Sequence, residues 1–230
     1  MISLILIILN FVFRADSTHF RGGSMSYKNG ITNGSNVHVD ISISMAWRRS
    51  YGPTCYCDDA VILSKKLIGD VTDITCLIGC ASSLLKDIET NIPLEITTHC
   101  NSYSIEDDWS LGRKTSKIIL PNDQNIVVGF KGTAWLKLEN KAKESTKNLD
   151  SLGYEFRMKL DTTTRMDTGK INNSPVSLIP PIIRLRKGFK YDLKMGTSDE
   201  DNDDIRCRWS LFSKNECAGK NFPLFVECHL

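Results

Sequence analysis

The stretch NVHVDISISMAW (residues 36–47) alternates apolar and polar side chains from one end to the other. Successive side chains of a β-strand point to opposite faces, so this alternation predicts a strand with one buried face. The apolar face consists of Val37, Val39, Ile41, Ile43 and Met45. The polar face consists of His38, Asp40, Ser42 and Ser44. The clearest element of the chain therefore favours a fold built from half-buried strands.

Most of the other recognisable elements are also strands. The further candidates are KIIL (117–120), NIVVGF (125–130), TAWLKL (133–138) and YEFRMKL (154–160). The turn residues PND (121–123) separate the first two, and Gly132 separates the next pair. The one good helical candidate, DAVILSKKLI (59–68), contains β-branched residues that weaken a helix. The polar segment 139–151 is expected to be an exposed loop, and the chain as a whole is expected to be all-β.

A boundary is expected where polar residues, Gly169 and three prolines cluster, within residues 162–181. We predict a β-rich, cysteine-containing domain over residues 18–165, a linker over 166–177 and a second β domain over 178–230. Alternation beyond the boundary predicts strands within PIIRLRKGFKYDLKM (181–195), IRCRWSLF (205–212) and FPLFVECHL (222–230). The expected architecture is two β-sandwich-like parts stapled by disulfides, the second of them short of a complete sandwich.

The first residues carry a targeting signal. ISLILIILNFVF (2–13) is apolar but shorter than the about 20 residues that span a bilayer, and small residues at Ala15 and Ser17 follow it. This pattern predicts a signal peptide over residues 1–17, with an uncleaved anchor or a core strand as alternatives. The formal net charge of +2 argues against a nucleic-acid binder that depends on bulk charge. We therefore expect a secreted protein, or the ectodomain of a longer surface protein.

Eight cysteines agree with export, because disulfides persist in oxidising compartments. They are Cys55, Cys57, Cys76, Cys80, Cys100, Cys207, Cys217 and Cys228. We expect disulfides whose pairing the sequence leaves open; a zinc site made by the first four is the alternative, but its spacing is unusual. Five cysteines precede residue 101 and three follow residue 206, so complete pairing needs a bridge between the two parts. Otherwise each part keeps an unpaired thiol.

Two sequons fit the same compartment and predict a glycoprotein. Asn33-Gly-Ser35 lies in a stretch rich in glycine and asparagine, which is typical of an exposed turn. Asn172-Asn-Ser174 is followed by Pro175, which makes it the poorer acceptor.

Five carboxylates occupy six positions in DEDNDD (199–204). Asp199, Asp201 and Asp203 can turn to one side, and calcium binds six to eight oxygen ligands, so these three are a candidate calcium site. Glu106, Asp107, Asp108 or Asp167 could complete such a shell from the first domain. The alternative is a solvated turn, whose charge would be offset by the basic residues Arg184, Arg186, Lys187 and Lys190.

The second part resembles cadherin-like and related immunoglobulin-like repeats of metazoan surface proteins, over about residues 178–212. The likeness is carried by PPIIRLRKGFKYDLKM (180–195) and DEDNDDIRCRWSL (199–211), a proline-led strand, an aromatic strand after Gly188 and an Asp-x-Asp-x-Asp turn. Asn202 stands where such repeats commonly have glycine. The resemblance implies a β domain in an extracellular setting.

The chain as a whole resembles an uncharacterised group of metazoan secreted or surface ectodomains. The shared landmarks are THFRGGSMSY (18–27), AWRRS (46–50), CDDAVI (57–62), EDDWSLG (106–112), RMDTGKINNSPV (165–176) and RCRWS (206–210). This resemblance implies location and architecture, and it implies no particular activity.

Nothing in the sequence matches a catalytic motif such as Gly-x-Ser-x-Gly or His-Glu-x-x-His, so no catalytic residue is expected. RRS (48–50) and RLRKGFK (184–190) are short basic stretches that fit an acidic partner such as heparin, or else a solvated strand face. We expect an extracellular binding or adhesion module with a protein or matrix partner. The alternatives are a self-associating matrix component and, less in keeping with the sequence, a secreted hydrolase.

Overall fold

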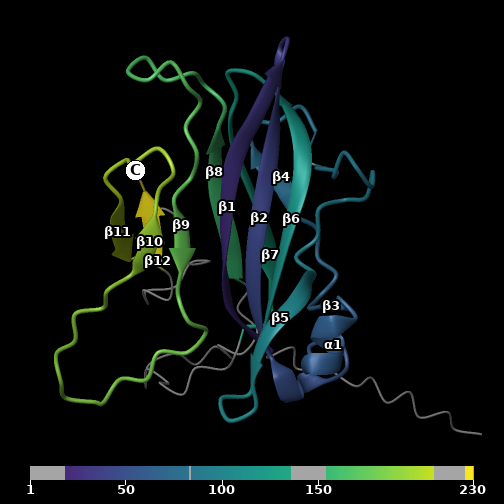
Figure 1. The fold of residues 1–230 in the computed structure, drawn as a ribbon, viewed down its shortest axis with the longest axis vertical. Helices are drawn as coiled ribbons and strands as arrows, with labels where there is room; N and C mark the ends of the chain where they lie inside the picture. Colours follow the sequence, from purple (N-terminus) through teal and green to yellow (C-terminus); the bar gives the residue numbers. More distant parts are fainter. Residues whose placement is uncertain (1–18, 83, 136–153, 210–225, 230) are drawn as a thin grey trace, which may run out of the picture.

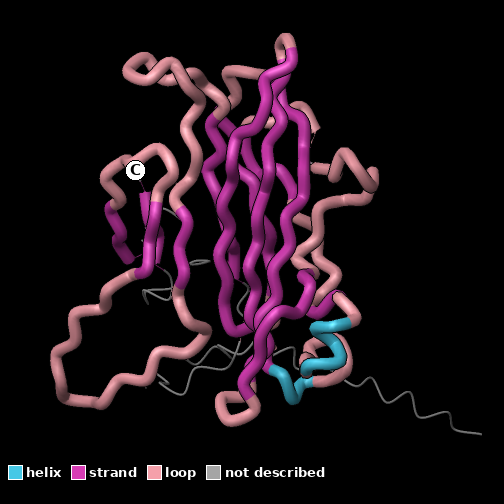
Figure 2. Tube along the Cα trace, viewed as in Figure 1, coloured by secondary structure: helices cyan, strands magenta, loops and turns pink. Residues whose placement is uncertain are grey.

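The computed structural model describes residues 19–82, 84–135, 154–209 and 226–229 (Figure 1). Two antiparallel sheets dominate it. The larger sheet has the spatial order β1 (Phe20–Asn33), β2 (Asn36–Arg48), β6 (Trp109–Pro121), β5 (Thr98–Ser104) and β3 (Leu67–Ile68). The smaller sheet has the order β4 (Thr75–Ile78), β7 (Asn125–Gly132) and β8 (Tyr154–Asp161). Strands make up most of the regular structure in the described chain (Figure 2), and the all-β prediction is confirmed.

Strand β2 is the predicted strand of residues 36–47, and it pairs with β1 on one side and β6 on the other. All five apolar positions of its alternating face are buried, whereas the polar positions between them are half-buried. A central position with one face in the core explains why this sequence alternates so cleanly. The predicted strands at 117–120, 125–130 and 154–160 are also confirmed, within β6, β7 and β8.

The two sheets enclose one hydrophobic core, and Phe20 at the start of β1 lies inside it. Its ring meets Trp47 of β2 edge-on at 5.2 Å between centroids. Edge-on contacts with Phe130 of β7 (6.2 Å) and Phe156 of β8 (5.8 Å) reach the opposite sheet. Aromatic pairs in this geometry add to the free energy gained from area burial alone, so Phe20 joins the two sheets of the sandwich.

The predicted helix over residues 59–68 is only half right. Helix α1 (Asp59–Leu63) begins after Asp58, whose carboxylate accepts the amide N–H of Val61 at 2.8 Å. It ends because Lys65 takes a positive φ of 51° and the chain then enters β3. Residues 133–135 of the strand predicted at 133–138 do not form a strand, and Trp135 pairs with Phe20 in an isolated bridge. Residues 136–138 and the loop predicted at 139–151 lie outside the described residues.

The second part consists of two short ribbons beside the sandwich. One pairs β9 (Val176–Leu178) with β10 (Gly196–Ser198), and the other pairs β11 (Arg206–Trp209) with β12 (Val226–His229). The last pair confirms strands within the predicted segments 205–212 and 222–230. Within residues 154–209 and 226–229, these two-stranded ribbons are the sheets of the second part, and whether they belong to a larger sandwich is untested. The division into domains at residues 166–177 stays a prediction.

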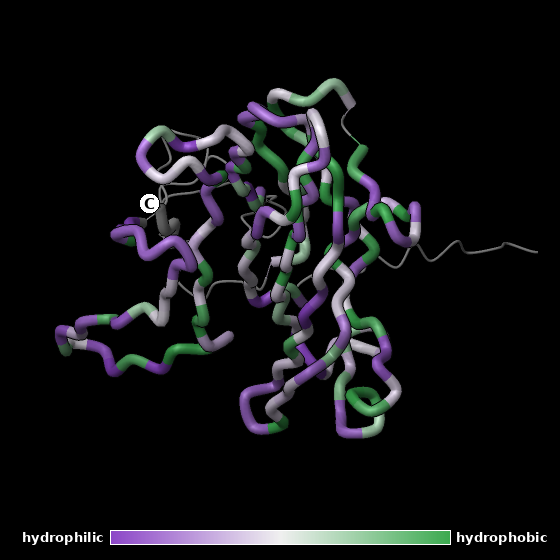
Figure 3. The backbone as a smooth tube through the Cα atoms, turned by 45° about the horizontal axis from the view of Figure 1, so that its top comes forward, coloured by the Kyte–Doolittle hydropathy of each residue, from purple (hydrophilic) through white to green (hydrophobic). Residues whose placement is uncertain are grey.

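The strand predicted within residues 181–195 is wrong. This segment forms a long loop between β9 and β10 that extends away from the sandwich (Figure 3). Its apolar side chains, including Phe189 with 61% of its surface exposed, face solvent in the described structure. A strand needs a hydrogen-bonding neighbour, and here the chain turns back on itself at Gly188 (φ 89°). The Tyr191 hydroxyl accepts the amide N–H of Arg186 at 2.9 Å across this turn.

The cysteines form disulfides in part. Cys57 pairs with Cys100 of β5, and Cys76 pairs with Cys80 after β4, so neither pair has thiolates to hold zinc. Cys55 contradicts the expectation of a disulfide: it is a free thiol, fully buried as a small apolar side chain. Burial raises its pKa to about 12, so the thiol stays protonated and unreactive.

The remaining cysteines belong to the second part. Cys207 of β11 is disulfide-bonded and lies opposite Cys228 of β12 in the ladder. Cys217 lies outside the described residues, as does the predicted signal peptide. Across the part of the chain that the structure describes, no helix is both long and apolar enough to cross a bilayer.

Candidate functional site at the acidic turn

Residues 172–174 run along the outer edge of β1 and satisfy its hydrogen-bonding groups. The amide N–H of Tyr27 donates to Ser174 Oγ at 2.7 Å, and the amide N–H of Ser174 donates to the Tyr27 carbonyl at 3.0 Å. Asn29 donates its amide N–H to Asn173 Oδ1 (2.8 Å) and its side-chain amide to the Asn172 carbonyl (2.6 Å). The unpaired N–H and carbonyl groups of an open strand edge can pair with a strand of another chain, and residues 172–174 cover part of that edge.

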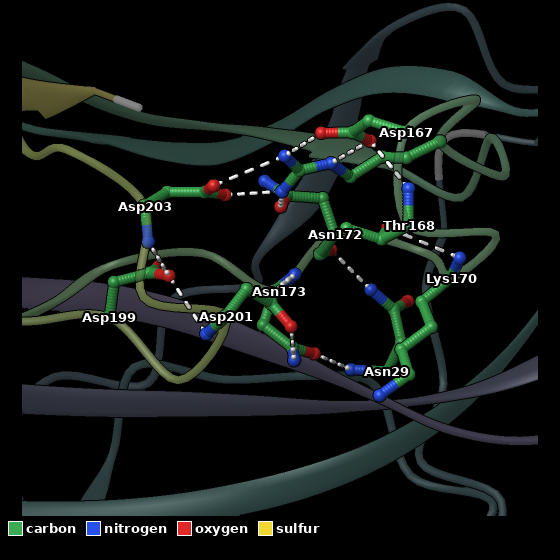
Figure 4. A network of polar contacts seen from close by, with 10 residues as sticks. Asn29, Asp167, Thr168, Lys170, Asn172, Asn173, Asp199, Asp201 and Asp203 are labelled. Atoms are coloured by element: carbon green, nitrogen blue, oxygen red, sulfur yellow. Dashed lines mark hydrogen bonds and ion pairs between the residues drawn. The ribbon is translucent and has the colours of Figure 1, made fainter.

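The acidic turn lies beside this segment (Figure 4). Asp199 Oδ1 accepts the amide N–H groups of Asp201 (2.9 Å) and Asp203 (3.1 Å), which folds the turn around one carboxylate. Asn202 takes the left-handed conformation at φ 61°, which asparagine tolerates better than most residues. Both oxygens of Asp201 accept hydrogen bonds from Asn173, one from its amide N–H at 2.7 Å. The turn is therefore docked on the residues that cover β1.

Arg165 is the counter-charge of the turn. Its guanidinium forms a bidentate contact with Asp203, in which Nη2 donates to Oδ1 at 3.1 Å and Nη1 donates to Oδ2. The same group donates to Asp167 from Nε (3.0 Å) and Nη2 (2.6 Å), and to Asn172 Oδ1 from Nη1 (2.7 Å). Asp167 and then Asp203 raise the pKa of Arg165, which stays charged throughout. One arginine thus joins the turn to the residues on β1.

The structure brings the three predicted carboxylates together. Ligand oxygens of Asp199, Asp201 and Asp203 lie within 4.8 Å of one another. The proposed completion of a metal shell by residues 106–108 is not seen, because Asp107 pairs with Arg184 and Asp108 accepts hydrogen bonds from Ser50. Asp167 does reach the turn, but through Arg165.

The predicted source of positive charge is also wrong. Arg165 neutralises Asp203, and Lys28 of β1 pairs with Glu200 at 2.5 Å, whereas Arg184 pairs with Asp107 away from the turn. Arg165 and Asp203 are 38 positions apart in sequence, and no local pattern marks them as partners. A lone arginine in RMDTG carries no signal that a sequence reader could have used.

The oxygen atoms of the three carboxylates are mostly engaged. Asp201 and Asp203 use both oxygens, and Asp199 uses Oδ1, which leaves Asp199 Oδ2 buried without a hydrogen-bond partner in the described structure. The positive charge of Arg165 beside the cluster opposes a second cation. The arrangement serves best as a structural ion-pair network, and the calcium hypothesis made from the sequence is untested.

We expect calcium to leave the thermal unfolding temperature unchanged, because Arg165 and Asn173 already occupy the cluster. A ligand at about 100 times its Kd would add about 2.7 kcal/mol, which thermal unfolding with calcium and with chelator would detect as a shift of several degrees. The control variant is Asp204→Asn, because that carboxylate is 82% exposed. A calcium-dependent shift that Asp201→Asn abolishes and Asp204→Asn retains would instead establish a calcium site.

Arg165→Gln is expected to loosen the acidic turn. The substitution leaves Asp203 without its counter-charge, so the amide protons of Asp201 and Asn173 should exchange with solvent faster while those of β2 stay protected. Hydrogen exchange followed by mass spectrometry measures both. The matched control is Arg206→Gln, because Arg206 pairs with Asp204 on the exposed surface, where a salt bridge contributes little.

The effect of Arg165→Gln on hydrogen-exchange protection is expected to depend on pH. The hydrogen bonds from Arg165 hold the pKa of Asp167 below its ordinary value of 3.8. A depressed carboxyl pKa stabilises the fold above the unfolded pKa, and the stabilisation is lost as pH falls through the folded pKa. The difference in protection between the natural chain and Arg165→Gln should therefore shrink below about pH 4. A difference in protection that does not shrink at all as the pH falls below the ordinary carboxyl pKa would contradict the ion-pair network.

The two sequons occupy different settings. Asn33 is exposed at the end of β1, directly before the two-residue turn Gly34-Ser35 in which Gly34 has φ 61°. The Asn172 side chain accepts a hydrogen bond from Arg165, and Ser174 of the same sequon is bonded to β1. Glycosylation at either asparagine stays a prediction.

A family model described as "Integrin beta-like protein A-E, N-terminal" matches residues 21–149, more than half of the 230-residue chain. The chain belongs to this integrin beta-like family. The matched region covers β1 from its second residue to β7, whereas β8 and the acidic turn lie beyond it. No curated protein and no solved structure matches the chain.

Membership of the integrin beta-like family indicates an extracellular, adhesion-type domain, and the disulfides point to the same extracellular or surface location. The resemblance to a surface ectodomain is confirmed at this level. The cadherin-like resemblance of residues 178–212 is not confirmed, because the match ends before that segment begins. The family match and the disulfides thus support the predicted extracellular setting.

Proposed function

We propose that this chain is a binding module of an extracellular adhesion-type protein and acts by contacting a protein partner without catalysis. The observation that carries the proposal is the integrin beta-like family match over residues 21–149. A disulfide-bonded sandwich supports it, because such a scaffold holds loops and strand edges rigid for recognition.

The network around Arg165 would serve the same purpose. It fixes residues 172–174 and the acidic turn against β1, so that the ribbons β9–β10 and β11–β12 leave the sandwich from a defined place. A rigid junction reduces the entropy lost when a partner binds both parts. Secretion, glycosylation and the absence of catalysis belong to the proposal as expectations.

The second candidate is a matrix component that associates with itself. The exposed apolar side chains of the β9–β10 loop favour it, Phe189 and Leu185 among them, because such surfaces promote association. The binding module would bind a different protein, whereas the matrix component would bind further copies of itself.

An adhesion assay combined with a measurement of molecular mass separates the candidates. Beads coated with the purified chain should retain cells of the species from which the sequence comes, in excess of albumin-coated beads, while the chain in solution sediments as a monomer. Beads coated with reduced and alkylated chain are the matched control and should lose the excess. Retention no greater than with albumin would overturn the adhesion proposal. Concentration-dependent oligomers together with no retention would establish self-association in its place.

A further inference from the structure

A small pocket lies at the far end of β2 from the β1–β2 turn. It is lined by Arg49, Ser50, Gly52, Pro53, Tyr56 and Lys66, and its volume is about 350 Å³. Arg49 belongs to the short 3₁₀ turn Arg49–Tyr51 that follows β2, and Lys66 directly precedes β3. Two cationic side chains from separate segments therefore meet at one opening.

Arg49 is held in place from three sides. Its Nε donates to the carbonyl of Cys57 at 2.7 Å. Its guanidinium lies 4.3 Å from the ring centroid of Tyr56 and 5.2 Å from that of Tyr103. The Tyr103 hydroxyl in turn donates to Asp59 at 3.1 Å, which fixes that ring. An arginine oriented by a carbonyl and two rings loses little entropy when it binds an anion.

One disulfide links the residue that holds Arg49 to the residue that holds the Lys66 backbone. Cys57, whose carbonyl holds Arg49, is bonded to Cys100 of β5. The amide N–H of Cys100 donates to the carbonyl of Lys66 at 3.2 Å. The fold therefore fixes the guanidinium of Arg49 and the backbone of Lys66, and a preoriented arginine is typical of a recognition site.

The charged ends of both side chains are available. Within the described residues, neither Nη1 and Nη2 of Arg49 nor Nζ of Lys66 forms a hydrogen bond or ion pair. The nearby carboxylates have other partners: Asp58 caps α1, and Asp108 accepts hydrogen bonds from Ser50 and Arg48. The free fork of Arg49 matches the two oxygens of a carboxylate, and Lys66 adds a second positive charge.

We propose that this pocket binds the carboxylate of an acidic side chain, Asp or Glu, on the protein partner. The pocket is large enough to admit an acidic side chain, and two cations are enough for one carboxylate. Asp108 is hydrogen-bonded to the pocket residue Ser50, and its negative charge would repel a polyanionic glycan laid across this surface. The inference rests on the proposed function as a binding module and names the contact that the module makes.

Binding of an oligoglutamate peptide, with an oligoglutamine peptide of the same length as the uncharged control, tests the proposal. In titrations followed by NMR, oligoglutamate should bind and oligoglutamine should not. The affinity for oligoglutamate should fall about tenfold in Lys66→Gln and in Arg49→Lys, which keeps the charge but loses the fork. Arg206→Gln, an exposed arginine on β11, is the matched control and should bind as the natural chain does. Lys66 is exposed, so its variant is expected to fold normally.

Any of the following outcomes would overturn the inference: equal binding of the two peptides, unchanged affinity in both pocket variants, or binding of a heparin oligosaccharide in the pocket without binding of oligoglutamate. The last outcome would assign the pocket to an acidic glycan. The adhesion assay keeps the two proposals apart. Equal retention of cells by the natural chain and by Lys66→Gln would contradict the pocket inference and leave the adhesion proposal intact. Binding of oligoglutamate without retention of cells would contradict the adhesion proposal and leave the pocket inference intact.

Discussion

Phe20→Ala is expected to lower the free energy of unfolding by about 3–5 kcal/mol. Phe20 is completely buried, and its ring touches Trp47 in one sheet and Phe130 and Phe156 in the other. Truncation removes those contacts and leaves a cavity where the two sheets meet, which the strands cannot close without losing their register. Urea unfolding followed by tryptophan fluorescence measures the change.

The matched control for this prediction is Phe189→Ala. Phe189 is 61% exposed in the β9–β10 loop, and substitution of exposed side chains usually changes stability by no more than about 0.5 kcal/mol. A loss at Phe20 no larger than the loss at Phe189 would show that β1 does not join the two sheets.

Removal of the Cys57–Cys100 disulfide is expected to cost about 4 kcal/mol, since it closes a loop of 43 residues in the unfolded chain. The double variant Cys57→Ser/Cys100→Ser removes the bond without leaving a free thiol beside buried Cys55. The same variant should also weaken oligoglutamate binding, because the Cys57 carbonyl holds Arg49 and the Cys100 amide N–H holds the backbone of Lys66. Urea unfolding and the NMR titration provide the two measurements.

The matched control is Cys76→Ser/Cys80→Ser. This disulfide spans four positions, so the same relation predicts a cost of about 2 kcal/mol, half as large. Equal losses in the two double variants would contradict a stabilisation that depends on loop length. Weakened oligoglutamate binding in the Cys76/Cys80 variant would contradict the assignment of the pocket to the Cys57–Cys100 pair.

The carboxylates of the candidate site could be predicted from the sequence because they are close together along the chain, whereas their partners are distant. Asp199, Asp201 and Asp203 alternate within five positions, so a single turn brings them together and the sequence is enough to group them. Their partners Arg165 and Asn173 come from another segment, and Asn173 in turn reaches Asn29, 144 positions away. No local pattern encodes such pairs, so a reading of the sequence assigns the counter-charge of the turn to the wrong arginine.

The amino-acid pattern is sufficient to establish the all-β character of this protein and the strands around residues 36–47, 117–130 and 154–160. Period-two alternation is a local property, and a strand with one face in the core imposes it residue by residue. The same alternation is misleading at residues 181–195, because a strand also needs a hydrogen-bonding neighbour, which the fold has to supply.

The pairing of the cysteines and the counter-charge of the acidic turn follow only from the folded chain, as does the meeting of Arg49 and Lys66. The Cys57–Cys100 bond, the Arg165–Asp203 pair and the meeting of Arg49 with Lys66 each join segments that are separated in sequence and that only the fold brings together. Side-chain packing joins residues that are distant in the sequence, and no local sequence pattern identifies which residues will meet.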